Sequence, residues 1–206
     1  MNRRGFLRIA GCGAAVAATT GLSRSMARPA GKPNIVFLMA DDHRAFAMGC
    51  VGDRDIETPN MDRLAERGVL FDRCYATSPL CMASRATVFT GMYEYKTGCN
   101  FSTGKVSAAD WNGLSYAVLL RKAGYRTAFA GKWGFPLDVP GYPKHFDKWG
   151  GFTGAGQGSY TTAKNPSMKS YAKKHPHVTR ALGAFGQDFI RESKAAGKPF
   201  CLSLSF

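Results

Sequence analysis

Short apolar runs alternate with amphipathic segments along most of the chain. Residues 34–40 form a continuous apolar run with β-branched side chains, which predicts a strand buried on both faces. Further strands are predicted at 69–75, 126–130 and 200–206, and helices at 59–67, 84–90, 114–123 and 178–195. Because strands alternate with helices, we expect an α/β fold with a mainly parallel sheet flanked by helices.

Two segments depart from this pattern. Residues 134–177 are rich in Gly, Pro, Tyr and Lys and show no clear periodicity, which is typical of a functional or irregular stretch. The chain stops inside the predicted strand at 200–206, with no cap or tail. We therefore expect the sequence to be cut short.

The first 27 residues are typical of an export signal. Arg3 and Arg4 precede Phe-Leu and a third basic residue, as in twin-arginine signals, and residues 9–22 are small and mildly apolar. Ser25-Met26-Ala27 offers the small residues that a signal peptidase reads. The apolar run is too short to span a membrane. We expect residues 1–27 to be a signal peptide, with export to the periplasm by the Tat machinery.

A second interpretation of this segment is a lipoprotein, because the residues before Cys12 fit a lipobox. The apolar region mostly follows Cys12, where a lipobox needs it to come first, so cleavage before Arg28 is favoured.

Charge and cysteine content narrow the class of protein. The formal net charge is +14; residues 1–27 contribute four positive charges and no acid, which leaves +10 for residues 28–206. The basic residues are scattered and no nucleic-acid-binding motif is present, so we expect attraction of anionic substrates and no nucleic-acid partner. The six cysteines form no C-x-x-C pair, which favours one cysteine with special chemistry and several buried bystanders.

A pair of carboxylates follows the first predicted strand. In open α/β sheets ligands bind beyond the carboxyl ends of the strands. Asp41 and Asp42 would repel each other there unless a cation lies between them, and a hard divalent cation suits oxygen ligands. The alternative is a solvated turn.

Two further stretches could bind an anion. Cys81 lies in the turn before the predicted helix at 84–90, where free N–H groups favour anions and lower a thiol pKa, and Arg85 follows four residues later. Lys132 follows the strand at 126–130 between glycines. The alternatives are a structural cysteine beside a surface arginine, and an exposed lysine in a tight turn.

Three motifs in order carry a family resemblance. KPNIVFLMADD at 32–42, TPNMDRLAERGVLFDRCYATSPLCMASRATVFTG at 58–91 and LRKAGYRTAFAGKWG at 120–134 resemble the type I sulfatases of the alkaline-phosphatase-like superfamily. Their core motif C-x-(P/A)-x-R is matched by Cys81, Ala83 and Arg85. The resemblance is close over 32–134 and looser to the end. It implies that residues 28–206 are the N-terminal part of a sulfatase catalytic domain.

The resemblance also implies residue roles. A formylglycine-generating enzyme would convert Cys81 to formylglycine, whose hydrated aldehyde attacks the sulfur of a sulfated small molecule or glycan. Asp41 and Asp42, together with the formylglycine from Cys81, would bind Ca²⁺. Arg85 would stabilise the formylglycine and the charge of the site, and Lys132 would hold a sulfate oxygen and offset charge on the leaving group. The implied function is a sulfuric ester hydrolase. The alternatives are a phosphonate or phosphate monoester hydrolase and an inactive anion-binding fragment.

The sequence departs from the family pattern at two points. Gly134 stands where the family usually has a histidine two residues after the lysine. The family's remaining metal ligands, an Asp-Asn pair, and a further histidine and lysine are expected beyond residue 206, so the chain alone is expected to be inactive. His43 is interpreted as a loop histidine; no role is assigned to three others: His145, His175 and His177.

Overall fold

The computed structural model describes residues 31–152 and 158–206. The chain divides into two units, Met1–Lys32 and Pro33–Phe206, and every helix and strand described below belongs to the second. The expected signal peptide at 1–27, its cleavage before Arg28 and the lipobox at Cys12 lie outside the described residues.

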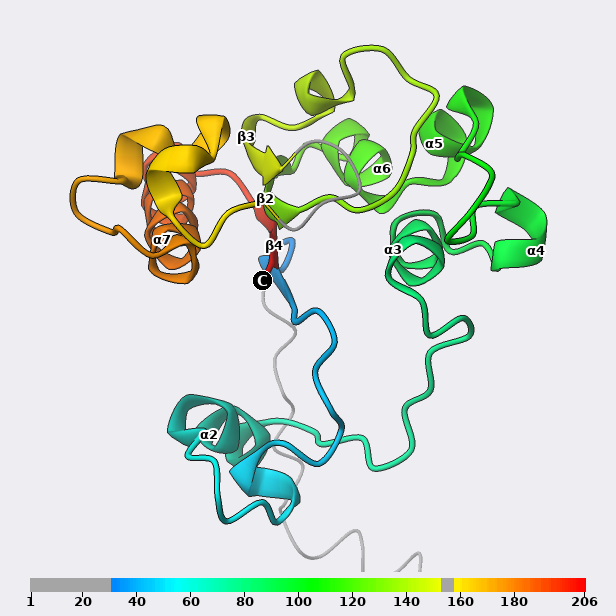
Figure 1. Ribbon diagram of the computed structural model, residues 1–206. Helices are drawn as coiled ribbons and strands as arrows, with labels where there is room; N and C mark the ends of the chain where they lie inside the picture. The colour runs from blue at the N-terminus through cyan, green and yellow to red at the C-terminus, as the bar shows by residue number, and fades with distance from the viewer. Residues whose placement is uncertain (1–30, 153–157) are drawn as a thin grey trace, which may run out of the picture. The chain divides into compact units, whose positions relative to one another are not determined.

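A four-stranded parallel sheet forms the centre of the second unit (Figure 1). Its order is β1-β4-β2-β3, and Leu202 of β4 pairs with Val36 on one side and with Ala128 on the other. The strands are β1 (Ile35–Met39), β2 (Arg126–Lys132), β3 (Lys148–Phe152) and β4 (Phe200–Ser205). The predicted α/β class with a parallel sheet is confirmed.

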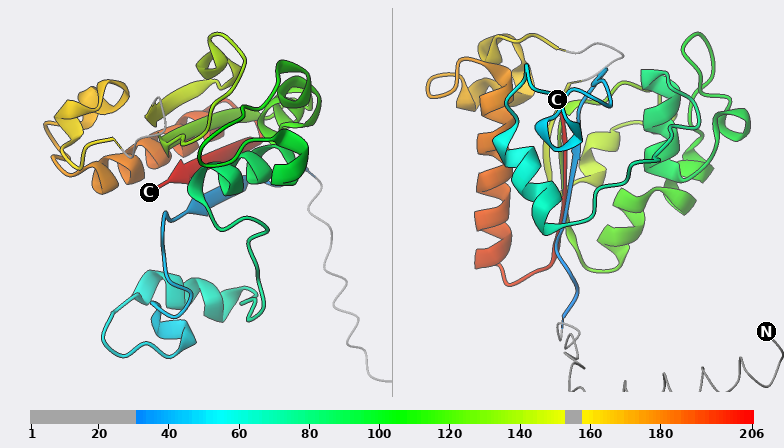
Figure 2. Two further views of the ribbon diagram at one scale, coloured as in Figure 1. Left: turned by 45° about the vertical axis from the view of Figure 1, so that its right-hand side comes forward. Right: turned by 90° about the horizontal axis from the view of Figure 1, so that it is seen from below.

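Helices cover the two faces of the sheet (Figure 2). On one face α7 (Val178–Ala195) packs its apolar side chains against Leu202 and Leu204. On the other face α3 (Cys81–Thr90), α5 (Ala108–Leu114) and α6 (Tyr116–Lys122) surround an aromatic core that includes Phe89, Trp111 and Trp133. Because successive side chains of a strand point to opposite faces, alternate residues of β2 line two different cores: Ala128 and Ala130 lie in the first, and Phe129 lies in the second.

The other described elements are short. They are α2 (Pro59–Arg67), α4 (Glu94–Thr97) and the 3₁₀ helices η1 (Gly49–Val51), η2 (Tyr142–His145), η3 (Thr162–Lys164) and η4 (Pro166–Tyr171). Thr58 and Gly68 flank α2, as predicted. None of the helices in 31–152 and 158–206 combines the length and apolar character that a membrane span requires.

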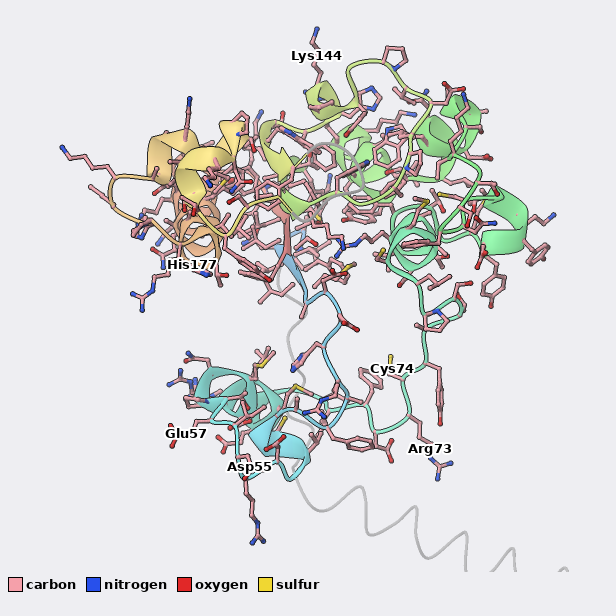
Figure 3. All side chains as sticks on the ribbon, viewed as in Figure 1. Asp55, Glu57, Arg73, Cys74, Lys144 and His177 are labelled. Atoms are coloured by element: carbon pink, nitrogen blue, oxygen red, sulfur yellow. The ribbon has the colours of Figure 1, made fainter. Side chains whose placement is uncertain are left out.

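Two predictions about strands are wrong. Residues 69–75 form no strand: the segment runs irregularly from α2 towards α3, with Arg73 and Cys74 projecting from it (Figure 3), and Phe71 is 74% exposed. An apolar run becomes a strand only where a neighbour pairs with it, and this run has none among the described strands. β1 is not buried on both faces either, because one of its faces is uncovered and leaves Val36 and Leu38 about half exposed.

Several predicted boundaries also shift. The helix predicted at 84–90 begins three residues earlier, at Cys81, and the one predicted at 114–123 corresponds to α6, which begins two residues later than predicted. The preceding helix, α5, was not predicted. β2 continues through Lys132. The stretch at 134–177 is not wholly irregular, since it contains β3 and three 3₁₀ helices. The predictions at 178–195 and 200–206 match α7 and β4 closely.

Candidate active site

Asp41 lies at the carboxyl edge of the sheet and is fixed there by backbone hydrogen bonds. Its N–H donates to the carbonyl of Phe206 at 3.1 Å, and the N–H of Phe206 donates to the carbonyl of Met39 at 2.9 Å. These bonds prolong the pairing of β1 with β4 beyond the ends of both strands. The carboxylate therefore stands where parallel α/β sheets bind their ligands.

Asp41 binds two cations from other parts of the sequence. Nζ of Lys132, the last residue of β2, donates to Oδ2 at 2.6 Å, and Nη2 of Arg85 in α3 donates to Oδ1 at 3.2 Å. The side chains of Lys132 and Arg85 are 9% and 2% exposed. The fold thus brings together three of the residues that the sequence predicted for the site.

The guanidinium of Arg85 is held by more than its ion pair. Nη1 donates to the carbonyl of Lys132 at 2.7 Å and to Oγ of Ser205 at 2.5 Å. Within the part of the chain that the structure describes, the buried Nε has no hydrogen-bond partner. Three of the five N–H groups of the guanidinium are thus engaged, which fixes its position.

The pKa of Asp41 is perturbed in a way that keeps it ionised. Burial by itself would raise this pKa, but the hydrogen bonds and positive charges of Lys132 and Arg85 outweigh burial and hold it below its ordinary value. Asp41 is consequently a carboxylate at neutral pH, and it balances charge between the two cations.

Cys81 is the first residue of α3, where the sequence placed it in the preceding turn. It lies one helical turn before Arg85, so both project from the same side of the helix. Its thiol is free and partly exposed, and it lines a cavity of about 710 Å³ together with Asp41, Arg85 and Lys132. The first turn of α3 carries no acidic side chain, so its free N–H groups favour an anion in this cavity.

The charged side chains around the cavity favour an anionic ligand. Asp42 and Arg44 also line it, so the wall carries three cationic and two anionic side chains. Asp42 has a φ of 53°, in the left-handed region that is uncommon for residues other than glycine. This turn places the second carboxylate directly after the first at the edge of the same cavity.

The donor chemistry around Asp41 fits a hard cation only in part. Asp41 and Asp42 supply carboxylate oxygens, the ligands that Ca²⁺ prefers, but Ca²⁺ takes about six to eight oxygens. Among residues 31–152 and 158–206, no group of three or more His, Cys, Asp or Glu side chains is placed to hold a metal ion. The described residues therefore supply a fraction of such a site.

The glycine at position 134 is required by its surroundings. Gly134 has a φ of 78°, and a Cβ built on it would lie 2.7 Å from Cδ and 3.1 Å from Nε of Arg85. A side chain here would be strained and would displace the guanidinium. The backbone and the buried arginine are therefore adapted to the absence of a histidine.

Three of the four histidines make structural contacts through their side chains. The Nε2 atom of His43 lies 3.0 Å from the carbonyl of Ala47, as suits a loop histidine. Nδ1 of His145 accepts a hydrogen bond from the indole of Trp111, and burial lowers the pKa of His145. His177 accepts a hydrogen bond from the first turn of α7.

Two serines were missed by the sequence analysis. Ser203 and Ser205 are buried on the same face of β4; the hydroxyl of Ser203 lies 2.7 Å from that of Tyr116, and Ser205 binds Arg85. The signal was present in the strand itself, since hydroxyls at alternate positions of a buried strand need polar partners.

The cysteines other than Cys81 were expected to be buried, and this holds for only some of them. All five described cysteines are free. Cys99 and Cys201 are buried bystanders, and burial raises the pKa of both thiols. Cys50 is partly exposed and Cys74 is exposed, which contradicts the expectation of buried bystanders for these two.

The sheet and its covering helices form the alkaline-phosphatase-like α/β fold that the sequence predicted. The family model described as Sulfatase matches residues 33–206, and the chain belongs to the sulfatase family. One relative is the N-acetylglucosamine-6-O-sulfatase of Bacteroides thetaiotaomicron, which is 35% identical over 172 residues, 83% of this chain and 29% of the relative. The chain thus spans less than a third of that relative's length.

Solved structures agree in fold. A protein in complex with its substrate D-glucosamine-2-N,6-O-disulfate superposes with a TM-score of 0.68 at 33% identity, over 85% of this chain and 34% of the other. Ps i-CgsB in complex with k-i-k-neocarrahexaose superposes with a TM-score of 0.71 at 29% identity, over 85% of this chain and 45% of the other. The phosphonate monoester hydrolase of Agrobacterium radiobacter superposes with a TM-score of 0.61 at 20% identity, over 85% of this chain and 40% of the other. At this identity the likeness shows a shared fold alone.

Proposed function

We propose that the protein is a sulfuric ester hydrolase whose nucleophile derives from Cys81. The observation that carries the proposal is one cavity, in a chain of the sulfatase family, where Cys81 lies beside the cluster of Asp41, Lys132 and Arg85. Formylglycine at position 81 would supply a hydrated aldehyde as the nucleophile.

The roles of the chain's own cations follow from their placement. Lys132 would hold a sulfate oxygen and offset charge on the leaving alcohol, because its ammonium reaches the cavity from the end of β2. Arg85 would stabilise the residue at position 81 and the charge of the ester, since its guanidinium is immobilised one turn along α3. Asp41 keeps both cations in place.

Asp41, Asp42 and the formylglycine from Cys81 would together hold Ca²⁺, which would polarise the sulfate when bound. The wall of the cavity already carries one more positive than negative charge, so a divalent cation needs further anionic ligands. We therefore propose that residues 1–206 alone bind Ca²⁺ weakly and turn over little or no ester.

The class of substrate is inferred from the names and bound ligands of the relatives. One acts on N-acetylglucosamine 6-O-sulfate by its name, one is bound to a glucosamine disulfate, and one is bound to a neocarrahexaose. We propose a sulfated small molecule or glycan as substrate. A phosphonate or phosphate monoester remains the alternative, with support from fold alone.

The remaining parts of the proposal concern processing. A formylglycine-generating enzyme would modify Cys81, and the Tat machinery would export the protein to the periplasm after recognising Arg3 and Arg4. A lipoprotein anchored through Cys12 is the alternative. Sequencing of the mature N-terminus distinguishes a start at Arg28 from a lipidated Cys12.

The test uses the protein expressed from its complete reading frame together with a formylglycine-generating enzyme. Hydrolysis of 4-methylumbelliferyl sulfate and of the matched phenylphosphonate ester is measured for the wild type and for Cys81→Ala. We expect sulfate release that depends on Cys81 and is lowered by several orders of magnitude in the variant. Equal activity of Cys81→Ala would refute the nucleophile, and faster phosphonate hydrolysis would favour the alternative.

A further inference from the structure

A second cavity has a volume of about 590 Å³, and some of its lining residues are neighbours in sequence of residues that line the first cavity. It is lined by Thr77, Ser78, Tyr93, Glu94, Tyr95, Gly98 and Asn100. It belongs to the loop before α3 and to α4 with its flanks, which follow α3 in the chain. None of the site residues described above lines it.

Two segments of the chain divide this cavity from the first. In one segment Ala76 and Pro79 line the first cavity, and the intervening Thr77 and Ser78 line the second. In the other segment Phe101 lines the first cavity, and its neighbour Asn100 lines the second. A molecule held in the first cavity could therefore extend over these segments into the second.

The aromatic side chains of the second cavity could stack against a flat, apolar ring face of a ligand. Tyr93 and Tyr95 are 55% and 78% exposed, and their rings stack with centroids 6.2 Å apart and planes 23° apart. The ammonium of Lys96 lies 6.0 Å from the centroid of Tyr95, which is within the range of a cation–π contact. Two adjacent exposed rings form an apolar patch, and burying such ring faces against a ligand is favourable.

Its polar groups suit a ring that carries hydroxyls. Glu94 contributes a carboxylate, and Thr77 and Ser78 contribute hydroxyls. The amide Oδ1 of Asn100 accepts hydrogen bonds from the N–H groups of Ser102 and Thr103, which leaves its NH₂ group as the donor side. Stacking faces beside a few donors and acceptors match a sugar, which has an apolar face of C–H groups and a rim of hydroxyls.

We infer that the second cavity is a subsite for a sugar ring linked to the sulfated one, with Tyr93 and Tyr95 as the stacking platform. The inference rests on the proposed function, because it assumes that the sulfate ester occupies the first cavity. It makes the substrate an oligosaccharide and assigns these tyrosines to substrate specificity.

Kinetics on two substrates test the subsite in the protein expressed from its complete reading frame. They are N-acetylglucosamine 6-sulfate and a chitotriose with a 6-O-sulfate on its terminal sugar. The quantity compared is kcat/KM on the trisaccharide divided by kcat/KM on the monosaccharide. We expect Tyr93→Ala and Tyr95→Ala each to lower this ratio about two- to tenfold, mainly by raising KM for the trisaccharide. Tyr93→Phe and Tyr95→Phe keep the rings and should keep the ratio. Tyr160 is 70% exposed and lines neither cavity, so Tyr160→Ala should also leave the ratio unchanged.

Binding of unsulfated chitotriose, followed by saturation-transfer NMR, separates this inference from the proposed function. If the protein hydrolyses no sulfate ester, the proposed function fails, whereas chitotriose binding that is lost in Tyr93→Ala and Tyr95→Ala would still support the subsite. If no chitotriose binding is seen, or if it persists in both variants, the subsite is refuted. A ratio that is also lowered in Tyr160→Ala would refute it as well.

Discussion

Replacing Arg85 by methionine tests how strongly the buried cluster holds the site together. The change removes the guanidinium but keeps a side chain of similar length. It leaves the carbonyl of Lys132 and the hydroxyl of Ser205 without their donor and takes from Asp41 one of its two cations. Removing one partner of a buried ion pair costs about 3–5 kcal/mol. Because Lys132 still neutralises Asp41, we expect the lower end, about 3 kcal/mol.

The assay is urea unfolding followed by the fluorescence of the tryptophans, two of which, Trp111 and Trp133, are fully buried. A fall in midpoint at constant m-value reports a loss of stability. Arg121→Met is the matched control: its ion pair with Asp147 spans 3.4 Å and its side chain is 44% exposed, so we expect at most about 1 kcal/mol. An Arg85→Met protein as stable as this control would show that Arg85 does not hold the cluster together.

Three further predictions concern the same cluster. Gly134→Ala should lower the melting temperature, because a φ of 78° costs a non-glycine residue about 1–2 kcal/mol and the new Cβ meets Arg85; an unchanged melting temperature would contradict this. The pKa of Asp41 is lowered in the folded state, so its ionised carboxylate stabilises the fold at pH values above its ordinary pKa of 3.8, and this stabilisation is lost as the pH falls through the pKa of the folded state. Asp41→Asn has no such contribution to lose, so its stability should fall less than that of the wild type in acid unfolding. Superimposable acid unfolding curves would argue against the ion pairs. Ser205→Ala should cost about 1–2 kcal/mol and lower kcat, measured by unfolding and by sulfate release, and normal values of both would exclude a role in placing Arg85.

The order of the elements could be predicted because local patterns specify it. α7 and β4 carry complete periodic patterns and were predicted almost to the residue. The segment at 69–75 has the composition of a strand but no pairing partner among the described strands, and pairing is a property of the whole sheet. β3 was missed because Lys148–Phe152 contains two glycines, which hide the strand pattern.

The residues of the site could be predicted from the sequence, but the hydrogen bonds and ion pairs between them could not. Strand ends and a motif identified Asp41, Cys81, Arg85 and Lys132. That Asp41 would bind both cations depends on which strands are neighbours, since β4 separates β1 from β2 and its end carries Ser205. The need for glycine at position 134 likewise depends in part on its closeness to Arg85, 49 positions away in the sequence, which no local pattern encodes.

The proposed function depends on chemical conversion of the side chain at position 81. The most direct test is a mass spectrum of the tryptic peptide of residues 74–85, taken from the protein expressed from its complete reading frame with a formylglycine-generating enzyme. The peptide contains Cys74 as an internal control, because that thiol is exposed but lies outside the motif. We predict an aldehyde at position 81 and an intact thiol at position 74. An unmodified thiol at position 81, or conversion of Cys74 in its place, would contradict the account.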